Sequence, residues 1–201
     1  MLIGLTGQIG AGKTTAARIL AGIGAHVLDA DQIGRQVVDE SKQLRSKLAH
    51  RFGKEILDRN GQVKRKKLAG LAFASEGSKK ALNGLVHPYL LKELRRQMKG
   101  AIRKHKLVVV DAALLLYWNM DREVDRVLVI HASEKTRFER TATRGISKSD
   151  ALARQKAQLP YNEFRRRADR IILNNGTREE LRAKLAGFLQ QIEHKLSHAA
   201  Y

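Results

Sequence analysis

The first fifteen residues, MLIGLTGQIGAGKTT, constrain the fold more than any other part of the chain. Residues 7–14 match the pattern G-x-x-x-x-G-K-[ST], after a short apolar run and before a segment that favours a helix over 14–21. The order strand, glycine loop, helix is the context in which this pattern forms a phosphate-binding loop. Because glycines let backbone N–H groups face a polyphosphate at a helix N-terminus, the segment predicts a nucleoside-triphosphate site.

Seven residues of this loop are expected to bind the nucleotide: Gly7, Gly10, Ala11, Gly12, Lys13, Thr14 and Thr15. Lys13 is also expected to be catalytic, because its ammonium group can hold the β- and γ-phosphates. The Thr14 hydroxyl can ligate Mg²⁺. A nucleoside triphosphate and Mg²⁺ are therefore the expected cofactors.

Composition narrows the class of protein. The chain has 39 basic and 20 acidic residues, a formal net charge of +19, and no cysteine. The lack of cysteine excludes a disulfide framework, a thiol nucleophile and a thiolate metal site. Positive charge attracts phosphorylated ligands and also nucleic acid, but aromatic residues are sparse and not interleaved with the basic runs, so nucleic-acid binding is possible without being expected.

A membrane segment is not expected. The longest apolar stretch, residues 107–118, is interrupted by Asp111 and is too short to span a bilayer. The apolar run at the N-terminus has no basic leader before it, which argues against a signal peptide. A cytoplasmic protein is the expectation.

The pattern of apolar segments indicates an α/β fold. Short runs rich in β-branched residues predict buried parallel strands over 2–6, 26–29, 107–111, 126–131 and 169–174. Helical patterns separate them. The interval between the second and third strands is too long for one crossover helix, and helices are expected there over 43–52, 65–73, 78–86 and 90–104, with Pro88 between the last two.

A second interval, residues 133–168, is helical and dense in arginine. The guanidinium groups of the arginines from 137 to 167 suit a lid that closes over phosphates, and Arg137, Arg140 and Arg144 fall on one face of the expected helix. A solvated face is the alternative for most of them, and Arg144, beside Gly145, is the one expected to be catalytic. Capping patterns begin helices at Ser147 and Thr177, and the final helix is expected to pack on the sheet.

These elements predict a three-layer, parallel-sheet, P-loop nucleoside-triphosphate kinase fold with a helical substrate-binding insert and a helical lid. The nucleotide-binding core would comprise residues 1–31, 105–135 and 168–201. The insert would comprise residues 32–104, and the lid residues 136–167.

Three carboxylates lie at the ends of expected strands. Asp29 and Asp31 come where the second strand ends, and ligands of open parallel sheets bind outside the carboxyl ends of the strands. A carboxylate there can accept the proton of an acceptor hydroxyl, or it can cap the following helix; for Asp31 both interpretations stay open. Asp111 ends the third strand in a Walker-B-like pattern, which predicts a contact to Mg²⁺, directly or through water.

The assembled motifs resemble the dephospho-coenzyme A kinase family over about residues 1–195. LTGQIGAGKTT is similar to that family's LTGGIGSGKST, and VLDADQIGRQVV, residues 27–38, to its V-I-D-A-D-x-I-A-R segment. LVHP at 85–88 matches an L-x-H-P turn. AQLP at 157–160, RAD at 167–169 and NNG at 174–176 resemble further family phrases in the same order.

The resemblance implies a reaction and a partner. The reaction would be ATP-dependent phosphorylation of the ribose 3′-hydroxyl of dephospho-CoA, the last step of CoA biosynthesis, with dephospho-CoA as the small-molecule partner. Asp31 would be the base, and the matching phrases imply that Asp29, Arg35 and His87 bind the substrate. The oligomeric state is left open.

Three positions depart from the family pattern. Ala113 stands where the family usually has proline, Tyr117 where glutamate is common, and Leu173 where aspartate precedes the N-x-G phrase. The phosphate loop, Asp31 and Asp111 are retained. Two alternatives stay open: another small-metabolite P-loop kinase, and a degenerate kinase that has become a nucleotide-gated nucleic-acid-binding protein.

Overall fold

The computed structural model of the chain describes residues 1–156 and 158–198. Ala157, the first residue of the AQLP phrase, therefore lies outside the described residues. The chain divides into two compact units, one of Met1–Val27 with Ala101–Tyr201 and one of Leu28–Gly100. We call them the sheet unit and the helical unit. The assignment of the insert to substrate binding and the limits of the lid stay predictions.

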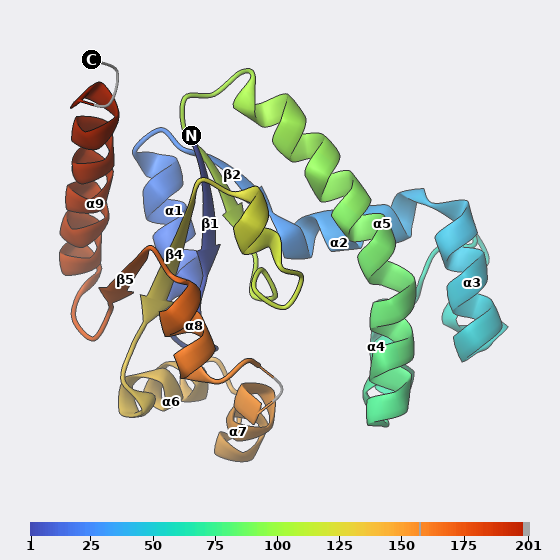
Figure 1. Cartoon of the computed structure of the whole chain (residues 1–201). Coiled ribbons are helices and arrows are strands. Elements are labelled where there is room, and N and C mark those ends of the chain that lie inside the picture. The colour runs from blue at the N-terminus through green and yellow to red at the C-terminus, as the bar shows by residue number, and fades with distance from the viewer. Residues whose placement is uncertain (157, 199–201) are drawn as a thin grey trace. The chain divides into compact units, whose positions relative to one another are not determined.

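The sheet has five strands in the order β2-β3-β1-β4-β5 (Figure 1). They are β1 Leu2–Thr6, β2 His26–Asp29, β3 Val108–Asp111, β4 Arg126–His131 and β5 Arg170–Leu173. All five expected strands are confirmed, the third and fifth slightly shorter than expected. The pairings of β1 with β3, β1 with β4 and β4 with β5 are parallel.

The central strand β1 positions the phosphate loop. All five of its residues are buried: a strand is paired on each side, and Ile3 and Leu5 pack in one cluster with residues of α1 and α9. Its register pairs Leu5 with Asp111, so β3 ends beside the start of the loop. Figure 1 shows α6, α7 and α8 gathered beyond the arrowheads of β1 and β4, at this same edge.

Two helices of the sheet unit share a core with the strands. They are α1 Lys13–Gly22 and α9 Arg178–His198. The apolar stripe Leu181, Leu185, Phe188 and Ile192 of α9 is buried in one cluster with Ile3, Leu5 and Ile130 of the sheet. The prediction that the final helix packs on the sheet is confirmed; the side chain of Leu196, the last residue of that stripe, lies outside the described residues.

The arginine-rich interval forms three short helices. They are α6 Glu134–Ala142, α7 Lys148–Lys156 and α8 Tyr161–Arg167. Both predicted caps are confirmed, because Ser147 Oγ accepts from Asp150 N at 3.1 Å and Thr177 Oγ1 accepts from Glu180 N at 3.2 Å. A single 3-10 turn, η2 Met120–Glu123, lies between β3 and β4.

The helical unit contains α2 Ala30–Glu40, α3 Lys42–Phe52, the 3-10 turn η1 Lys54–Ile56 and α4 Arg65–Phe73, and it holds most of α5 Glu76–Ile102. The expected break at Pro88 is wrong, because α5 continues through it. Proline there removes one hydrogen bond and costs about 3 kcal/mol. Burial of Leu90, Leu94 and Met98 on the same helix, at about 1.5–3 kcal/mol each, outweighs that loss.

No helix within residues 1–156 and 158–198 combines the length and the apolar content that a bilayer crossing requires.

Candidate active site

The phosphate loop leaves β1 at Gly7 and enters α1 at Lys13. Gly10 and Gly12 have φ angles of 78° and 97°, in the left-handed region that favours glycine. Space imposes the same choice: a Cβ on Gly10 would lie 2.5 Å from the carbonyl oxygen of Arg137, and one on Gly12 would collide with Nδ2 of Asn174. The loop therefore needs glycine for its own conformation and for the residues packed against it.

The N-terminus of α1 is suited to an anion. Gly12 is the N-cap residue and has no side chain that could accept hydrogen bonds from the first helical turn. A phosphate can accept them instead, and the helix dipole favours its negative charge. Thr14 is exposed in this turn, and Lys13 and Thr15 are partly buried. Lys13, Thr14 and Thr15 are among the seven loop residues predicted from the sequence to bind the nucleotide.

Lys13 and Asp111 form an ion pair, with side chains that are only 15% and 8% exposed. The pairing follows from topology, since Lys13 begins the helix after β1 and Asp111 ends the neighbouring β3. The structure thus brings together two residues that the sequence assigned to phosphate and to metal. A polyphosphate bound to the loop would compete with Asp111 for the ammonium group.

A buried asparagine joins the phosphate loop to the loop after β5. The side-chain Nδ2 of Asn174 donates to the carbonyl of Ala11 at 2.8 Å, and its backbone N–H donates to the carbonyl of His131 at 2.7 Å. Its own carbonyl accepts from Arg140 Nη1 at 2.8 Å. The next residue, Asn175, accepts from the backbone N–H of Ser133 through Oδ1 at 2.8 Å.

The three arginines that the sequence placed on one helix face occupy different environments. Arg137 is 5% exposed, and Arg140 donates to the loop after β5. The expectation that Arg144 shares their helix face is wrong, because α6 ends at Ala142 and Arg144 lies exposed in the turn that follows. The turn forms because Gly145 adopts a φ of 73°, which ends the helix.

The buried guanidinium of Arg137 is incompletely satisfied. Its Nη1 donates weakly to Gln155 at 3.4 Å, and its Nε has no hydrogen-bond partner among the described residues. Burial lowers the pKa of Arg137, and the nearby carboxylate of Glu134 acts in the opposite direction. A buried donor without an acceptor is the kind of group that a bound anion can satisfy.

His131 is the last residue of β4, close enough to Arg137 to feel its charge. Its ring stacks on that of Tyr161, with centroids 4.0 Å apart. Burial lowers the pKa of His131, and the positive charge of Arg137 lowers it further. The neutral imidazole is therefore the favoured form in the folded protein.

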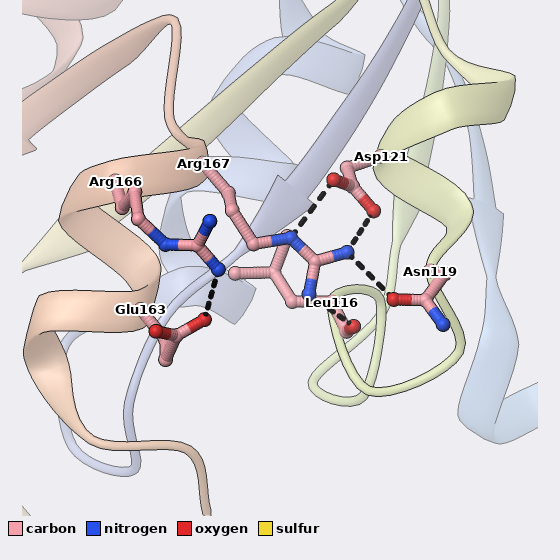
Figure 2. Close-up of polar contacts among 6 residues, drawn as sticks. All are labelled: Leu116, Asn119, Asp121, Glu163, Arg166 and Arg167. Atoms are coloured by element: carbon pink, nitrogen blue, oxygen red, sulfur yellow. Dashed lines mark hydrogen bonds and ion pairs between the residues drawn. The ribbon is translucent and has the colours of Figure 1, made fainter.

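Helix α8 is held at both ends. Just before it, Gln158 Oε1 accepts from the backbone N–H of Ile9 in the phosphate loop at 2.9 Å. At its last residue, the guanidinium of Arg167 donates to both carboxylate oxygens of Asp121 and to the carbonyl of Leu116 (Figure 2). Arg167 also donates to Asn119 Oδ1 at 3.0 Å. The α8 end of the arginine-rich interval is thereby fixed to the loop that follows β3.

Four predicted site residues lie at or in the helical unit. Asp29 Oδ1 accepts from the backbone N–H groups of Asp31 at 2.8 Å and Gln32 at 3.1 Å, so Asp29 caps α2. Asp31 lies in the first turn with an exposed side chain, and Arg35 is exposed one turn later. His87 is half-buried in α5, and burial lowers its pKa.

Two of the three residues that depart from the family pattern form hydrogen bonds through their backbone carbonyls, and the third faces solvent. The carbonyl of Ala113 accepts from Thr6 Oγ1 at 3.5 Å, and that of Leu173 accepts from Lys184 Nζ at 2.8 Å. The side chain of Tyr117 is 64% exposed. Since every residue has a carbonyl, neither backbone contact depends on the side chain at that position.

Sequence reasoning assigned no role to Asn174 or Gln158, and it counted Arg167 only among the arginines that suit a lid, without its contacts to Asp121 and Leu116. Each lies in a phrase that carried the family resemblance, but the resemblance alone did not say what the side chain contacts. The signal that could have marked these residues is their position: each is a polar residue at the end of a strand or beside a short helix. Its partners are more than forty positions away in the sequence, so spacing could not identify them.

Comparisons with known proteins bear on the family and the fold of the chain. A family model described as dephospho-CoA kinase matches residues 1–180. The dephospho-CoA kinase of Geobacillus kaustophilus is 37% identical over 193 residues, covering 95% of this chain and 96% of that protein. A crystal structure from Thermus thermophilus has a TM-score of 0.78 at 31% identity, covering 95% of this chain and 97% of that one. The dephospho-CoA kinase from Campylobacter jejuni has a TM-score of 0.69 at 25% identity, covering 95% and 96%. The predicted fold class is confirmed.

Proposed function

The chain belongs to the dephospho-CoA kinase family, and on this premise we propose that it transfers the γ-phosphoryl group of ATP to the ribose 3′-hydroxyl of dephospho-CoA. The products are CoA and ADP, and the step is the last of CoA biosynthesis. The observation that carries the proposal is the phosphate loop, with Lys13 held at its helix N-terminus by Asp111. The two alternative functions are not favoured, because the relatives match nearly the whole chain.

The nucleotide end of the reaction rests on charge and backbone geometry. ATP bound at the N-terminus of α1 accepts hydrogen bonds from the loop amides and draws Lys13 from Asp111 toward the β- and γ-phosphates. The backbone of Arg137 packs against Gly10, and we assign its buried Nε, which has no hydrogen-bond partner among the described residues, as a further donor to the phosphates. These groups offset the negative charge that concentrates on the γ-phosphoryl oxygens during transfer.

The metal donors present suit Mg²⁺. Thr14 offers a hydroxyl and Asp111 a carboxylate, which are the hard oxygen ligands that Mg²⁺ takes alongside substrate phosphates and water. Among the residues whose side chains the structure describes, no three acidic, histidine or cysteine side chains group into a metal site, and our proposal therefore leaves the remaining coordination to phosphates and water. A bound Mg²⁺ would neutralise charge on the β- and γ-phosphate oxygens.

The acceptor end rests on Asp31. The 3′-hydroxyl oxygen forms the new bond to the γ-phosphorus, and the bond from that phosphorus to the bridging oxygen breaks to release ADP. The hydroxyl proton passes to the Asp31 carboxylate, which the capping work of Asp29 leaves available. We place Arg35 and His87 as contacts to the acceptor, and Arg144 as a contact to the phosphates from the lid.

A coupled assay of ADP release tests the proposal. The wild-type protein, given ATP and Mg²⁺, is compared across dephospho-CoA, 4′-phosphopantetheine, adenosine and shikimate as acceptors. We expect turnover with dephospho-CoA to exceed that with every other acceptor by at least about a hundredfold, since a missing polar contact alone can cost that much. Equal turnover with an unrelated acceptor would instead identify a different small-metabolite kinase. We also propose a cytoplasmic location, because ATP-dependent CoA synthesis takes place there.

A further inference from the structure

We propose that Asn174 is a positioning residue of the phosphate loop, which turns the Ala11–Gly12 peptide so that its N–H group faces the bound polyphosphate. Asn174 lies after β5, far from the glycine motif in sequence, and it is 5% exposed. The proposal deepens the proposed function, since it rests on ATP binding at this loop. It does not depend on which acceptor receives the phosphoryl group.

The planarity of the peptide bond carries the first step. The bond between Ala11 and Gly12 is trans, so the carbonyl of Ala11 and the N–H of Gly12 lie in one plane and point in opposite directions within it. Nδ2 of Asn174 donates to that carbonyl at 2.8 Å and fixes which way it points. The Gly12 N–H must then point away from Asn174. One side-chain hydrogen bond therefore sets the direction of a loop amide.

The close contact at Gly12 carries the second step. A Cβ on Gly12 would collide with Nδ2 of Asn174, so the side chain lies directly against the loop backbone. Ala11 is itself 0% exposed, and water has no access to replace the lost donor. A buried carbonyl left without a hydrogen-bond partner is unfavourable, which favours rotation of the peptide.

Asn174 is itself held rigidly. Its backbone N–H donates to the carbonyl of His131 at the end of β4, and its carbonyl accepts from Arg140 of α6. The Asn174 side chain has only two rotatable bonds, and the backbone that carries it is hydrogen-bonded through both its N–H and its carbonyl group. Such support is what keeps a binding loop in a competent conformation before the ligand arrives.

Two adjacent asparagines provide a matched test. Asn174 uses its side-chain NH₂ as a donor, whereas Asn175 uses its side-chain oxygen as an acceptor. Asn174→Asp therefore removes the essential donor, while Asn175→Asp keeps its acceptor and adds the same charge one position away. Asn174→Ala removes the donor without any charge and serves if the aspartate variant does not fold, as judged by circular dichroism.

Binding of ATP, inorganic tripolyphosphate and adenosine to each variant is measured by isothermal titration calorimetry, without acceptor. We expect Asn174→Asp and Asn174→Ala to raise the Kd of tripolyphosphate and of ATP about tenfold, which corresponds to the loss of one hydrogen bond between the loop and the phosphate. The Kd of adenosine should stay within about twofold of the wild-type value. Asn175→Asp should stay within about threefold for all three ligands.

Two results would overturn the proposal. One is weaker adenosine binding with unchanged tripolyphosphate binding, which would place Asn174 at the nucleoside end. The other is an equal change for all three ligands, including no change, which would make its role structural. Because no acceptor is present, a failure here is separate from a failure of dephospho-CoA turnover in the ADP-release assay.

Discussion

At the scale of single residues, Asp29 and Asp31 show that the position of a residue at a helix start determines the role of its side chain. Both are exposed aspartates at the start of α2, separated by one residue. The sequence left open whether Asp31 caps the helix. The structure gives the cap to Asp29, whose oxygen accepts from two backbone N–H groups, and so leaves the Asp31 carboxylate available for chemistry.

Asp31→Asn is expected to lower kcat by about 10²–10⁴-fold, because an amide cannot accept the proton of the 3′-hydroxyl. The Kd of ATP should barely change, since Lys13 and the loop amides bind the phosphates. Steady-state kinetics with dephospho-CoA and calorimetry with ATP measure the two effects separately.

A control for this variant lies on the same helix. Asp39→Asn also removes one carboxylate from α2, but Asp39 pairs with Arg65 in a half-exposed ion pair. Such pairs contribute about 0–1 kcal/mol, so kcat should stay within about twofold of wild type. Equal losses in the two variants would mean that kcat responds to the charge of α2 rather than to a base at position 31.

The pH dependence of stability is expected to include His131. Its pKa in the folded protein is lowered by burial and by Arg137, so the unfolded chain binds the proton more readily. Stability from this residue is then fully present above the unfolded value near 6.5 and is lost as pH falls through the lower folded value. Thermal melts at pH 8 and below pH 6 measure the loss.

His131→Phe keeps a flat ring against Tyr161 and removes the titrating group. We expect its Tm to fall less on acidification than the Tm of the wild type. If both proteins lose the same Tm between the two pH values, the acid sensitivity comes from other groups.

At the scale of elements, α8 carries two neighbouring arginines in contrasting environments. Arg167 and its partner Asp121 are 15% and 16% exposed, and Arg167 also binds the carbonyl of Leu116 (Figure 2). Arg166 is 69% exposed and pairs with Glu163, three residues earlier on the same helix. The carboxylate of Glu163 has a lowered pKa because Arg166 donates to it.

Arg167→Ala is expected to cost about 2–4 kcal/mol, because it leaves Asp121 largely buried without a cation. For a chain of this size that corresponds to a Tm lower by roughly 5–15 °C. Differential scanning fluorimetry measures the shift.

Arg166→Ala is the matched control, one residue away on the same helix. An exposed pair at this spacing contributes about 0.5 kcal/mol or less, so its Tm should fall by no more than about 2 °C. A comparable fall in both variants would indicate that α8 is sensitive to any loss of arginine, and that the contacts of Arg167 carry no special weight.

Local sequence patterns predicted the strands correctly, but they did not predict features that depend on contacts between residues far apart in the sequence. The five strands follow from short apolar runs, and the phosphate loop from glycines and one lysine, because those signals lie within a few residues. Pro88 misled the prediction of a helix break, since the buried residues that keep α5 continuous are spread over the next ten positions. Asn174 could not be assigned, because its partner Ala11 lies at the other end of the chain.

At the scale of the whole molecule, the net charge of +19 is the property that the fold does not explain. Both proposed substrates are polyanions, and a positive field raises their local concentration and rate of association. Exposed basic clusters such as residues 64–67 of the helical unit contribute to that field. The same field attracts RNA and DNA without reading their sequence.

The two consequences differ in their response to salt. Raising KCl from about 0.05 M to about 0.5 M shortens the Debye length from over 10 Å to a few ångströms. We expect kcat/KM for dephospho-CoA to fall with salt, while kcat stays within about twofold, because Lys13, Asp111 and the loop amides act at contact distance. Steady-state kinetics over the series measure both quantities.

RNA added to the same assay separates a general field from a dedicated nucleic-acid site. A general field predicts inhibition by RNA at low salt that vanishes near physiological salt, since non-specific binding weakens steeply as counterions compete. Inhibition that persists at about 0.2 M KCl would require contacts beyond charge. That outcome would mean that the positive surface serves a second ligand, and the expectation that it only attracts the substrates of the kinase would be wrong.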